Sequence, residues 1–357
     1  MASSSLGRQE WVAPAWFVSL AILGALYIAP SLVRLLNHLA LCFHQPMDLG
    51  RRYGAWAVVT GPTSGIGRSM TLELARRGLN LVLVGHNAAN VEEISETIGS
   101  RYGVQTKTVL FDLSLVSTPK GDEAMGRLRD VVGGLDVGVL VNNAGVVELG
   151  ARYLHEADVE AWMGMVRVNL WAVTELTAAV LPGMLKRGRG AVVNMGSASS
   201  EAIPSFPLYT MYAATKRYVA HFSNSLYVEY KRKGIHVQCQ AEQIGDITSE
   251  GSGLWPPLSK QLGRPAPLYV RTRMLSRLAD KSSLYALLIA LTPDTYARAA
   301  VRWIGHGPPL CVPNIPHQLL WCVAAVVPDQ LHDWLRLREH RRHREMCPTL
   351  AEERFVS

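Results

Sequence analysis

The stretch Val58-Val59-Thr60-Gly61-Pro62-Thr63-Ser64-Gly65-Ile66-Gly67 decides the fold. It joins an apolar run at residues 56–59 to a segment with helical apolar spacing at residues 70–75. A buried strand, a glycine-rich turn and a helix form a unit that binds dinucleotides, because glycines let the backbone approach a pyrophosphate and the helix N-terminus favours its charge. The spacing Gly61-x3-Gly65-x-Gly67 differs from the common G-x-G-x-x-G pattern.

Further apolar runs follow this unit, and helical patterns separate them. Strands that alternate with helices predict an α/β fold, a Rossmann-like doubly wound parallel sheet that is covered on both faces. Ligands in such sheets bind at the carboxyl ends of the strands, where Asn142-Asn143-Ala144-Gly145 and Ser197 follow their runs. The predicted strands after the first are residues 79–85, 109–113, 135–141, 191–196 and 235–240.

Tyr212 and Lys216 carry the chemistry that this sequence predicts. A lysine four residues after a tyrosine lies on the same helix face, so its ammonium comes close to the phenol. Nearby positive charge lowers the pKa of a phenol from about 10 towards working pH. Ser197, fifteen residues before Tyr212, supplies a second hydroxyl to the same substrate oxygen. Together these groups suit protonation of a carbonyl oxygen while hydride arrives at its carbon.

With a lone Asn169 between them, these motifs resemble the short-chain dehydrogenase/reductase family over residues 52–240, and again near Pro267. The resemblance implies that Asn169 positions a water beside Lys216, and that Lys216 also binds the nicotinamide ribose. It implies a catalytic set of Ser197, Tyr212, Lys216 and Asn169, with Asp112 at the adenine amine. The expected cofactor-binding residues are Gly61, Thr63, Ser64, Gly65, Ile66, Gly67, His86, Asp112, Asn143, Ala144, Gly145, Tyr212, Lys216 and Thr272.

The end of the second predicted strand bears on the choice of cofactor. An acidic residue there would hold a ribose 2′-hydroxyl, but this chain has His86-Asn87. NADP-using relatives usually carry arginine at this position. Since nothing acidic repels a 2′-phosphate and Arg68 is near in sequence, we expect NADPH rather than NADH. The alternative is that His86 is an ordinary surface residue. The five cysteines show no metal-ligand spacing, so no metal site is expected.

Residues 11–33 carry no charge and are long enough to cross a bilayer core of about 30 Å. We expect an uncleaved membrane anchor within the N-terminal segment 1–33, and a linker at 34–50. Arg8 alone precedes the run, whereas Arg34, Arg51 and Arg52 follow it. The excess of positive charge after the anchor places the catalytic domain on the cytosolic side. The alternative is a helix that packs on the domain's own surface.

The pattern of strands and helices breaks within the domain predicted at 51–306. Residues 241–266 are rich in Gly, Ser and Pro and show no helical or strand period, so they are interpreted as an atypical insert. Long loops without regular structure are functional lids or disordered segments, and a retained intron is a third explanation. After the insert, residues 267–274 resemble the loop that closes over the nicotinamide in the family.

Residues 307–357 are predicted to form a basic C-terminal extension. Within it, residues 319–327 are apolar but too short to span a bilayer, so they either enter one leaflet or pack on the core. The arginines between 336 and 344 form either a solvated helix end or a patch for anionic lipid headgroups. The formal net charge of +7 raises the question of nucleic acid, but no nucleic-acid motif is present and none is expected as a partner.

Four local strings narrow the resemblance. With the anchor, they resemble the plant very-long-chain 3-oxoacyl-CoA reductases, relatives of the membrane-bound 17β-hydroxysteroid dehydrogenases. This implies NADPH-dependent reduction of 3-oxoacyl-CoA to 3-hydroxyacyl-CoA in fatty-acid elongation at the endoplasmic reticulum, with membrane lipid and other elongation enzymes as partners. The alternatives are a steroid or other lipid carbonyl reductase, and a catalytically weak homologue that binds elongation partners. The strings are residues 151–156, 207–216, 225–231 and 234–240.

Overall fold

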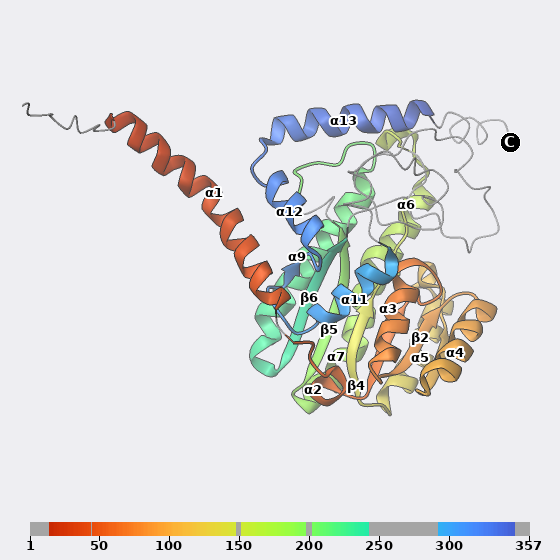
Figure 1. Cartoon of the computed structure of the whole chain (residues 1–357). Coiled ribbons are helices and arrows are strands. Elements are labelled where there is room, and N and C mark those ends of the chain that lie inside the picture. Colours follow the sequence, from red (N-terminus) through yellow and green to blue (C-terminus); the bar gives the residue numbers. More distant parts are fainter. Residues whose placement is uncertain (1–13, 44, 148–150, 198–201, 243–291, 347–357) are drawn as a thin grey trace, which may run out of the picture.

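The computed structural model describes residues 14–43, 45–147, 151–197, 202–242 and 292–346 (Figure 1). Within them the chain forms one sheet of seven strands in the order β3-β2-β1-β4-β5-β6-β7, and all paired strands are parallel. This is the doubly wound α/β sheet that the sequence predicts. The strands are β1 (Trp56–Thr60), β2 (Asn80–Gly85), β3 (Thr106–Leu110), β4 (Val137–Asn142), β5 (Gly190–Ser197), β6 (Ile235–Glu242) and β7 (Leu310–Cys311).

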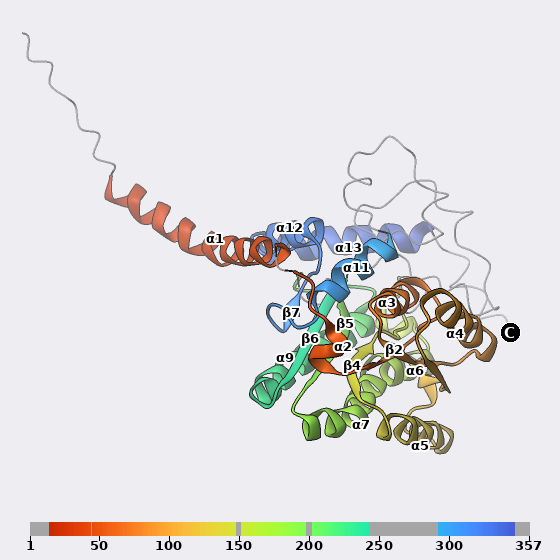
Figure 2. The same ribbon diagram turned by 60° about the horizontal axis from the view of Figure 1, so that its bottom comes forward.

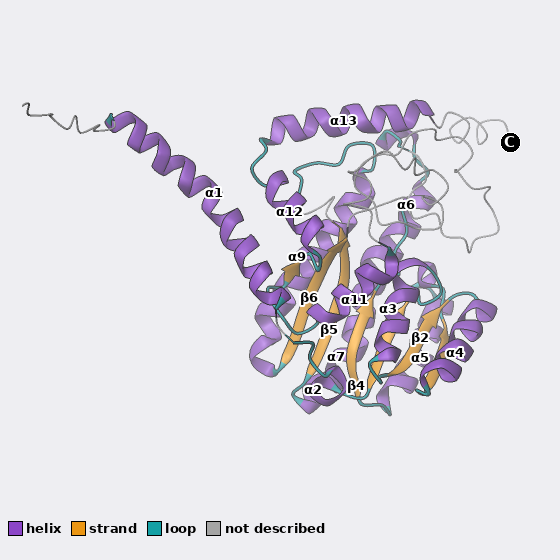
Figure 3. Cartoon of the chain, in the orientation of Figure 1, coloured by secondary structure: helices purple, strands orange, loops and turns teal. Residues whose placement is uncertain are grey.

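Helices cover both faces of the sheet (Figure 3). Alternate residues of a strand point to opposite faces, so Val59 packs in the core under α3 while Val58 packs in the core under α5 and α7. Because both faces are buried, the central strands are apolar throughout. The helices of the domain are α2 (Leu49–Tyr53), α3 (Gly65–Arg76), α4 (Ala88–Tyr102), α5 (Pro119–Gly133), α6 (Val159–Val166), α7 (Ala172–Arg187), α9 (Thr210–Tyr230) and α11 (Pro293–Trp303).

The third strand lies earlier in the chain than the sequence predicts. It spans Thr106–Leu110 instead of 109–113 and lies at the edge of the sheet, where Lys107 and Thr108 are exposed. Phe111 and Leu113 are buried and apolar, but the carboxylate of Asp112 accepts a hydrogen bond from the Ser114 N–H and starts a 3-10 turn. This cap ends the strand, and hydrophobicity alone does not reveal it.

The side of the sheet formed by β6 and β7 differs from the sequence prediction in two further ways. β6 continues through Glu242, where it pairs with Ser197, so the first two residues of the expected insert belong to the sheet. β7, which the sequence analysis missed, lies in the Pro-rich stretch after residue 306, and Leu310 pairs with Cys239. The rest of the insert, the loop at 267–274 and Thr272 lie outside the described residues.

The predicted anchor belongs to one long helix, α1 (Ala15–Cys42), which projects from the domain (Figure 1). It is longer than expected, because it continues through most of the predicted linker. It is long and apolar enough to cross a membrane, and the segment tested for this is not buried in the domain. The continuous α6–α7 segment, Val159–Arg187, passes the same test of length and composition, but it is half buried in the domain, as a core helix is.

Two helices follow β7 and complete the described chain: α12 (Ile315–Ala324) and α13 (Asp329–Met346). α12 lies beside the C-terminal part of α1 in both views (Figures 1 and 2). α13 crosses the domain beyond the carboxyl ends of the strands, which is the edge where the predicted site residues lie (Figure 1).

Candidate active site

The glycine-rich turn after β1 is fastened to the turn after β4. Thr60 Oγ1 accepts hydrogen bonds from the backbone N–H groups of Asn143 (3.0 Å) and Ala144 (2.9 Å). In return, the Asn143 side-chain amide donates to the carbonyl oxygens of Thr60 (3.0 Å) and Gly61 (3.2 Å). The two turns predicted to meet a dinucleotide are therefore adjacent and held rigidly together.

Glycine is required in this turn for two different reasons. Gly61 and Gly65 have φ values of +63° and +52°, in the left-handed region that residues with a side chain rarely adopt. At Gly67 a Cβ would collide with the Gly61 carbonyl oxygen and the Asn143 side chain. At Gly65, by contrast, a Cβ would meet nothing within 4 Å, and the Ser64 side chain makes no capping hydrogen bond to α3. The start of α3 thus offers open space and a positive helix end, which suits a pyrophosphate.

Tyr212 and Lys216 lie one turn apart on α9 and are both buried, with Tyr212 only 1% exposed. Lys216 Nζ lies 5.8 Å from the centroid of the Tyr212 ring. It also donates a hydrogen bond to the carbonyl oxygen of Met195 on β5 (2.9 Å), which fixes the ammonium between helix and sheet. The predicted pair is therefore assembled, with the positive charge held beside the phenol.

Ser197 is the last residue of β5 and is fully buried. It lies two residues after Met195, whose carbonyl holds Lys216. It therefore lies at the carboxyl edge of the sheet, as the sequence predicts, on the strand that also orients the lysine. Two other serines near it in sequence, Ser199 and Ser200, lie outside the described residues.

Asn169 lies in a π-helical segment, η3 (Arg167–Trp171), that joins α6 to α7. Such single-turn widenings of a helix occur frequently at functional sites. Its side-chain amide accepts from the Val146 N–H (2.8 Å) and donates to the Val146 carbonyl (2.7 Å) and to Thr215 Oγ1 (3.2 Å). Thr215 in turn donates to the carbonyl oxygen of Tyr212 (2.8 Å). Asn169 thus connects the turn after β4 to the helix that carries Tyr212 and Lys216.

Gly145 keeps this centre open. A Cβ built there would lie 3.4 Å from Lys216 Nζ and 3.5 Å from Asn169 Oδ1. The backbone of Gly145 therefore approaches both groups closely, and glycine adds no side chain between them. This agrees with the cofactor-side role expected for the turn at 142–145.

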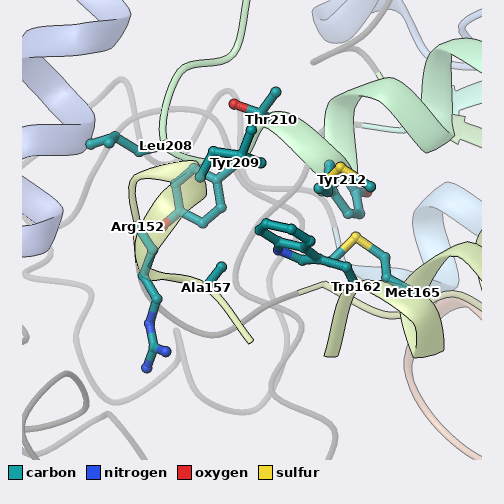
Figure 4. A pocket seen from close by; sticks show the side chains of 10 residues that line it. Arg152, Ala157, Trp162, Met165, Leu208, Tyr209, Thr210 and Tyr212 are labelled. Carbon is teal, nitrogen blue, oxygen red and sulfur yellow. The ribbon is translucent and has the colours of Figure 1, made fainter. Parts of the chain in front are cut away.

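A small pocket of about 290 Å³, part of it open to solvent, lies against Tyr212 (Figure 4). Its wall is mostly apolar. Figure 4 shows Trp162 and Met165 of α6 beside Tyr212, with the start of α9 on the other side. The lining residues are Arg152, Leu154, Ala157, Trp162, Met165, Leu208, Tyr209, Thr210, Met211 and Tyr212. The pocket thus borders the Tyr212 side chain with apolar groups.

α13 holds the segment that leads into this pocket. His340 Nδ1 donates to the carbonyl oxygen of Pro207 (2.6 Å), and its ring packs against Phe206 and Tyr209. At the far end of α13, Arg344 forms a two-pronged ion pair with Glu156, in which one hydrogen bond measures 2.8 Å. The hydrogen bond from Arg344 holds the pKa of Glu156 below its usual value.

Comparisons with known proteins agree with this geometry. Residues 55–248 match the family described as short chain dehydrogenase. The chain belongs to the short-chain dehydrogenase family.

Within this family, several relatives cover most of the chain. A very-long-chain 3-oxoacyl-CoA reductase-like protein of Arabidopsis thaliana is 40% identical over 299 residues, which is 83% of this chain and 84% of the relative. The very-long-chain 3-oxoacyl-CoA reductase of Anas platyrhynchos is 33% identical over 287 residues, 78% of each chain. A solved 7β-hydroxysteroid dehydrogenase has a TM-score of 0.61 at 21% identity, and covers 84% of this chain and 100% of its own. That likeness concerns the fold alone.

Three of the expected cofactor contacts are less defined than the glycine turn. His86 follows β2 directly and is exposed, as is Arg68 on α3, so the side chains of both are available from solvent. Asp112 is also exposed, and its carboxylate caps the turn at Ser114. These placements are compatible with the family roles, which remain predictions here.

The sequence analysis missed four residues that shape this short-chain dehydrogenase site. Thr60 and Thr215 act through hydrogen bonds to distant segments, and nothing in their local spacing marks them. Trp162 and Met165 form the pocket wall from α6, three residues apart on one helix face. Their apolar spacing was visible in the sequence, but it is equally typical of a core helix.

Proposed function

We propose that this chain reduces very-long-chain 3-oxoacyl-CoA to 3-hydroxyacyl-CoA with NADPH, as a step of fatty-acid elongation. The observation that carries the proposal is the pairing of Tyr212 with Lys216 on α9, with Lys216 held by the strand that ends in Ser197 and with Tyr212 lining an apolar pocket. The names of relatives at 33–40% identity that cover most of the chain support the choice of substrate.

In the proposed reaction, Tyr212 donates its phenolic proton to the C3 carbonyl oxygen of the substrate. The ammonium of Lys216 favours the phenolate that remains. The hydroxyl of Ser197 donates a hydrogen bond to the same oxygen as negative charge develops on it. Asn169, through Thr215 and Val146, keeps these groups in register. NADPH, when bound, supplies the hydride that attacks C3.

The residues present fit this cofactor. The uncapped start of α3 and the open space at Gly65 suit the pyrophosphate, and Tyr212 and Lys216 lie at the nicotinamide end of the same edge. His86 and Arg68 are the proposed partners of the 2′-phosphate. The position after β2 lacks the carboxylate that would favour NADH.

The substrate class also fits the anchor. Very long acyl chains partition into lipid, and α1 can hold the domain at a membrane. We place the enzyme at the endoplasmic reticulum, where the proposed elongation takes place, and its catalytic domain in the cytosol, because Arg34, Arg51 and Arg52 follow the uncharged part of α1. Membrane lipid and other elongation enzymes are its proposed partners.

A substrate panel tests the proposal. Purified full-length protein in detergent would be assayed with NADPH against 3-oxoacyl-CoA thioesters of increasing chain length and against ketosteroids. We expect turnover with the longest thioesters and little with ketosteroids. A relative of Gallus gallus, 35% identical over 224 residues, is named hydroxysteroid dehydrogenase-like protein 1, so steroid turnover is the outcome that would redirect the proposal. Turnover with neither class would favour the catalytically weak homologue.

A further inference from the structure

The outer side of α12 is an uncovered apolar stripe. Ile315, Leu319 and Val323 recur every four residues on one helix face, and all three are exposed, Val323 to 60%. No charged residue occurs between 315 and 327. The opposite side of the helix is buried against the domain through Gln318 and Trp321. α12 thus exposes aliphatic side chains on its outer face, where an ordinary surface helix would carry polar ones.

This stripe adjoins the helix that can cross a membrane. Cys322 Sγ donates to the carbonyl oxygen of Ser31 (3.5 Å), and the Arg34 guanidinium lies 4.2 Å from the centroid of the Trp321 ring. At the end of α12, the Tyr27 hydroxyl donates to the Val326 carbonyl (3.4 Å). The contacts run in opposite directions along the two chains, so the C-terminal end of α12 reaches furthest along α1 towards its membrane-spanning part.

The dimensions of α1 place these contacts at the membrane surface. Its 28 residues extend about 42 Å at 1.5 Å per residue, which exceeds a bilayer core of about 30 Å. The first charged residue within the helix is Arg34. If the uncharged part lies in hydrocarbon, Ser31 and Arg34 lie at its boundary, and α12 lies in the adjoining leaflet and headgroup region.

α13 continues this surface. Its outward face carries Leu331, Trp334 and Leu335 in the first half, with Trp334 exposed to 55%. Arg338 lies 5.3 Å from the centroid of the Trp334 ring, and the exposed Arg341 and Arg342 follow. Trp beside arginines is typical of a membrane–water interface, where the ring sits among headgroups and the guanidinium groups meet phosphate. The exposed acidic residues of this helix are Asp329, Asp333 and Glu345, and of these Asp333 lies on the side that faces the domain, where it accepts a hydrogen bond from Ser205.

We propose that the outer faces of α12 and α13 together form a membrane-binding surface, called the seat below, which contacts an anionic bilayer in addition to the anchor α1. The apolar stripe enters the leaflet, and the three arginines bind anionic headgroups. Continuity with α1 identifies the occupant, because α12 contacts the anchor at Ser31 and Arg34, where the uncharged part of the anchor ends.

The seat also affects how the substrate reaches the pocket, an inference that rests on the proposed function. The inner face of α13 holds the segment that enters the pocket: Asp333 accepts a hydrogen bond from Ser205, and His340 binds the Pro207 carbonyl. A bilayer under α13 therefore places the pocket entrance beside the leaflet that dissolves the acyl chain.

Lipid contact at single positions tests the seat. Full-length protein would be reconstituted into vesicles of phosphatidylcholine with or without phosphatidylserine, with a thiol-reactive fluorophore on Val323→Cys or Leu335→Cys. The signal of the labelled parent chain, which has its own cysteines, would be subtracted. We expect nitroxide-bearing lipids to quench both labels, and more strongly when phosphatidylserine is present.

Two controls flank these positions. Leu26→Cys in α1 reports the anchor. Val228→Cys is 65% exposed near the end of α9, just before β6 begins, and reports the surface at the amino-terminal ends of the strands. The proposal would be overturned if lipid quenched the labels at positions 323 and 335 no more than the label at position 228. This holds even if the label at position 26 is quenched. Protection of both labels from a water-soluble quencher without lipid quenching would also overturn it, in favour of a protein cover. Reductase turnover in detergent is measured separately. An absence of turnover would contradict the proposed function but not the membrane contact of α12 and α13.

Discussion

The side-chain amide of Asn169 pairs with both backbone polar groups of Val146, accepting at 2.8 Å and donating at 2.7 Å. The same amide reaches Thr215 on the helix of Tyr212 and Lys216. One buried side chain therefore fixes the distance between the turn after β4 and the catalytic helix. In a site where the proton donor and the hydride must meet one substrate, such a connection sets the alignment of the reacting groups.

Asn169→Ala should lower turnover while the protein still folds. Removing the amide takes away the hydrogen bonds to the part-buried N–H and C=O of Val146, each of which contributes about 0.5–1.5 kcal/mol to the free energy of unfolding. Asn169→Asp separates the two hydrogen bonds, because its carboxylate still accepts from the Val146 N–H but sets an oxygen against the Val146 carbonyl. We expect it to lose turnover as the alanine variant does, and thermal unfolding would be followed for both variants. Wild-type turnover in Asn169→Ala would contradict the positioning role.

Tyr212→Phe should lose most turnover and keep cofactor binding. General acid catalysis contributes roughly 10²–10⁴-fold, and the phenol is the donor that Lys216 activates. The reaction would be followed by NADPH consumption, and binding by NADPH fluorescence. Tyr230→Phe, at the other end of α9, removes a hydroxyl from the same helix and should leave turnover unchanged. Comparable rates for the two variants would remove Tyr212 from the mechanism.

Gly67→Ala should weaken cofactor binding and destabilise the domain. Its Cβ would meet the Gly61 carbonyl and the Asn143 amide that fasten the two turns, so the turn must shift. Gly99→Ala in α4 is the matched control, because its Cβ meets nothing within 4 Å and its backbone is ordinary helix. The control should raise the free energy of unfolding by about 0.5–1 kcal/mol. Equal NADPH affinities for the two variants would argue against the proposed pyrophosphate site.

His86→Arg should tighten NADPH binding and leave NADH binding nearly unchanged. A guanidinium holds a phosphate through paired hydrogen bonds, and the exposed position after β2 leaves room for the longer side chain. Kd values for both cofactors would be measured on the wild type and the variant. A clear preference of the wild-type protein for NADH would refute the cofactor assignment itself.

Stability should fall in mild acid because of His236. Burial lowers the pKa of His236 to about 4, and the neighbouring His306 acts in the same direction. The unfolded chain takes up this proton near the ordinary histidine pKa of 6.5, whereas the folded protein resists it until about pH 4. The contribution of His236 is therefore complete above 6.5 and is lost as the pH falls towards 4.

Thermal unfolding at about pH 7.5 and about pH 5 checks this expectation, since the second value lies inside the window. His236→Gln removes the titrating group and should show a smaller loss of Tm between the two conditions than the wild type. An equal loss in both proteins would assign the acid sensitivity to other groups.

The closeness of Tyr212 to Lys216 and the shape of the glycine turn were predictable because their geometry is local. Positions four apart on a helix share a face, and Gly61, Gly65 and Gly67 lie within one turn. The clamp made by Thr60 and the bridge made by Thr215 were not predictable, since each depends on a partner more than 40 residues away. The edge strand β3 was misplaced for a different, local reason. Its end is set by the side chain of Asp112, and the buried Phe111 and Leu113 lie beyond it.

The contact between Arg34 of α1 and Trp321 of α12 has a kinetic consequence. A catalytic domain packed against its anchor does not swing freely on a tether, so it meets dissolved lipids from one fixed side. Encounters with substrate then become a two-dimensional search. The quantity that governs the rate is the mole fraction of acyl-CoA in the lipid surface, and adding bare vesicles or micelles at constant total substrate should slow the enzyme by dilution within the plane.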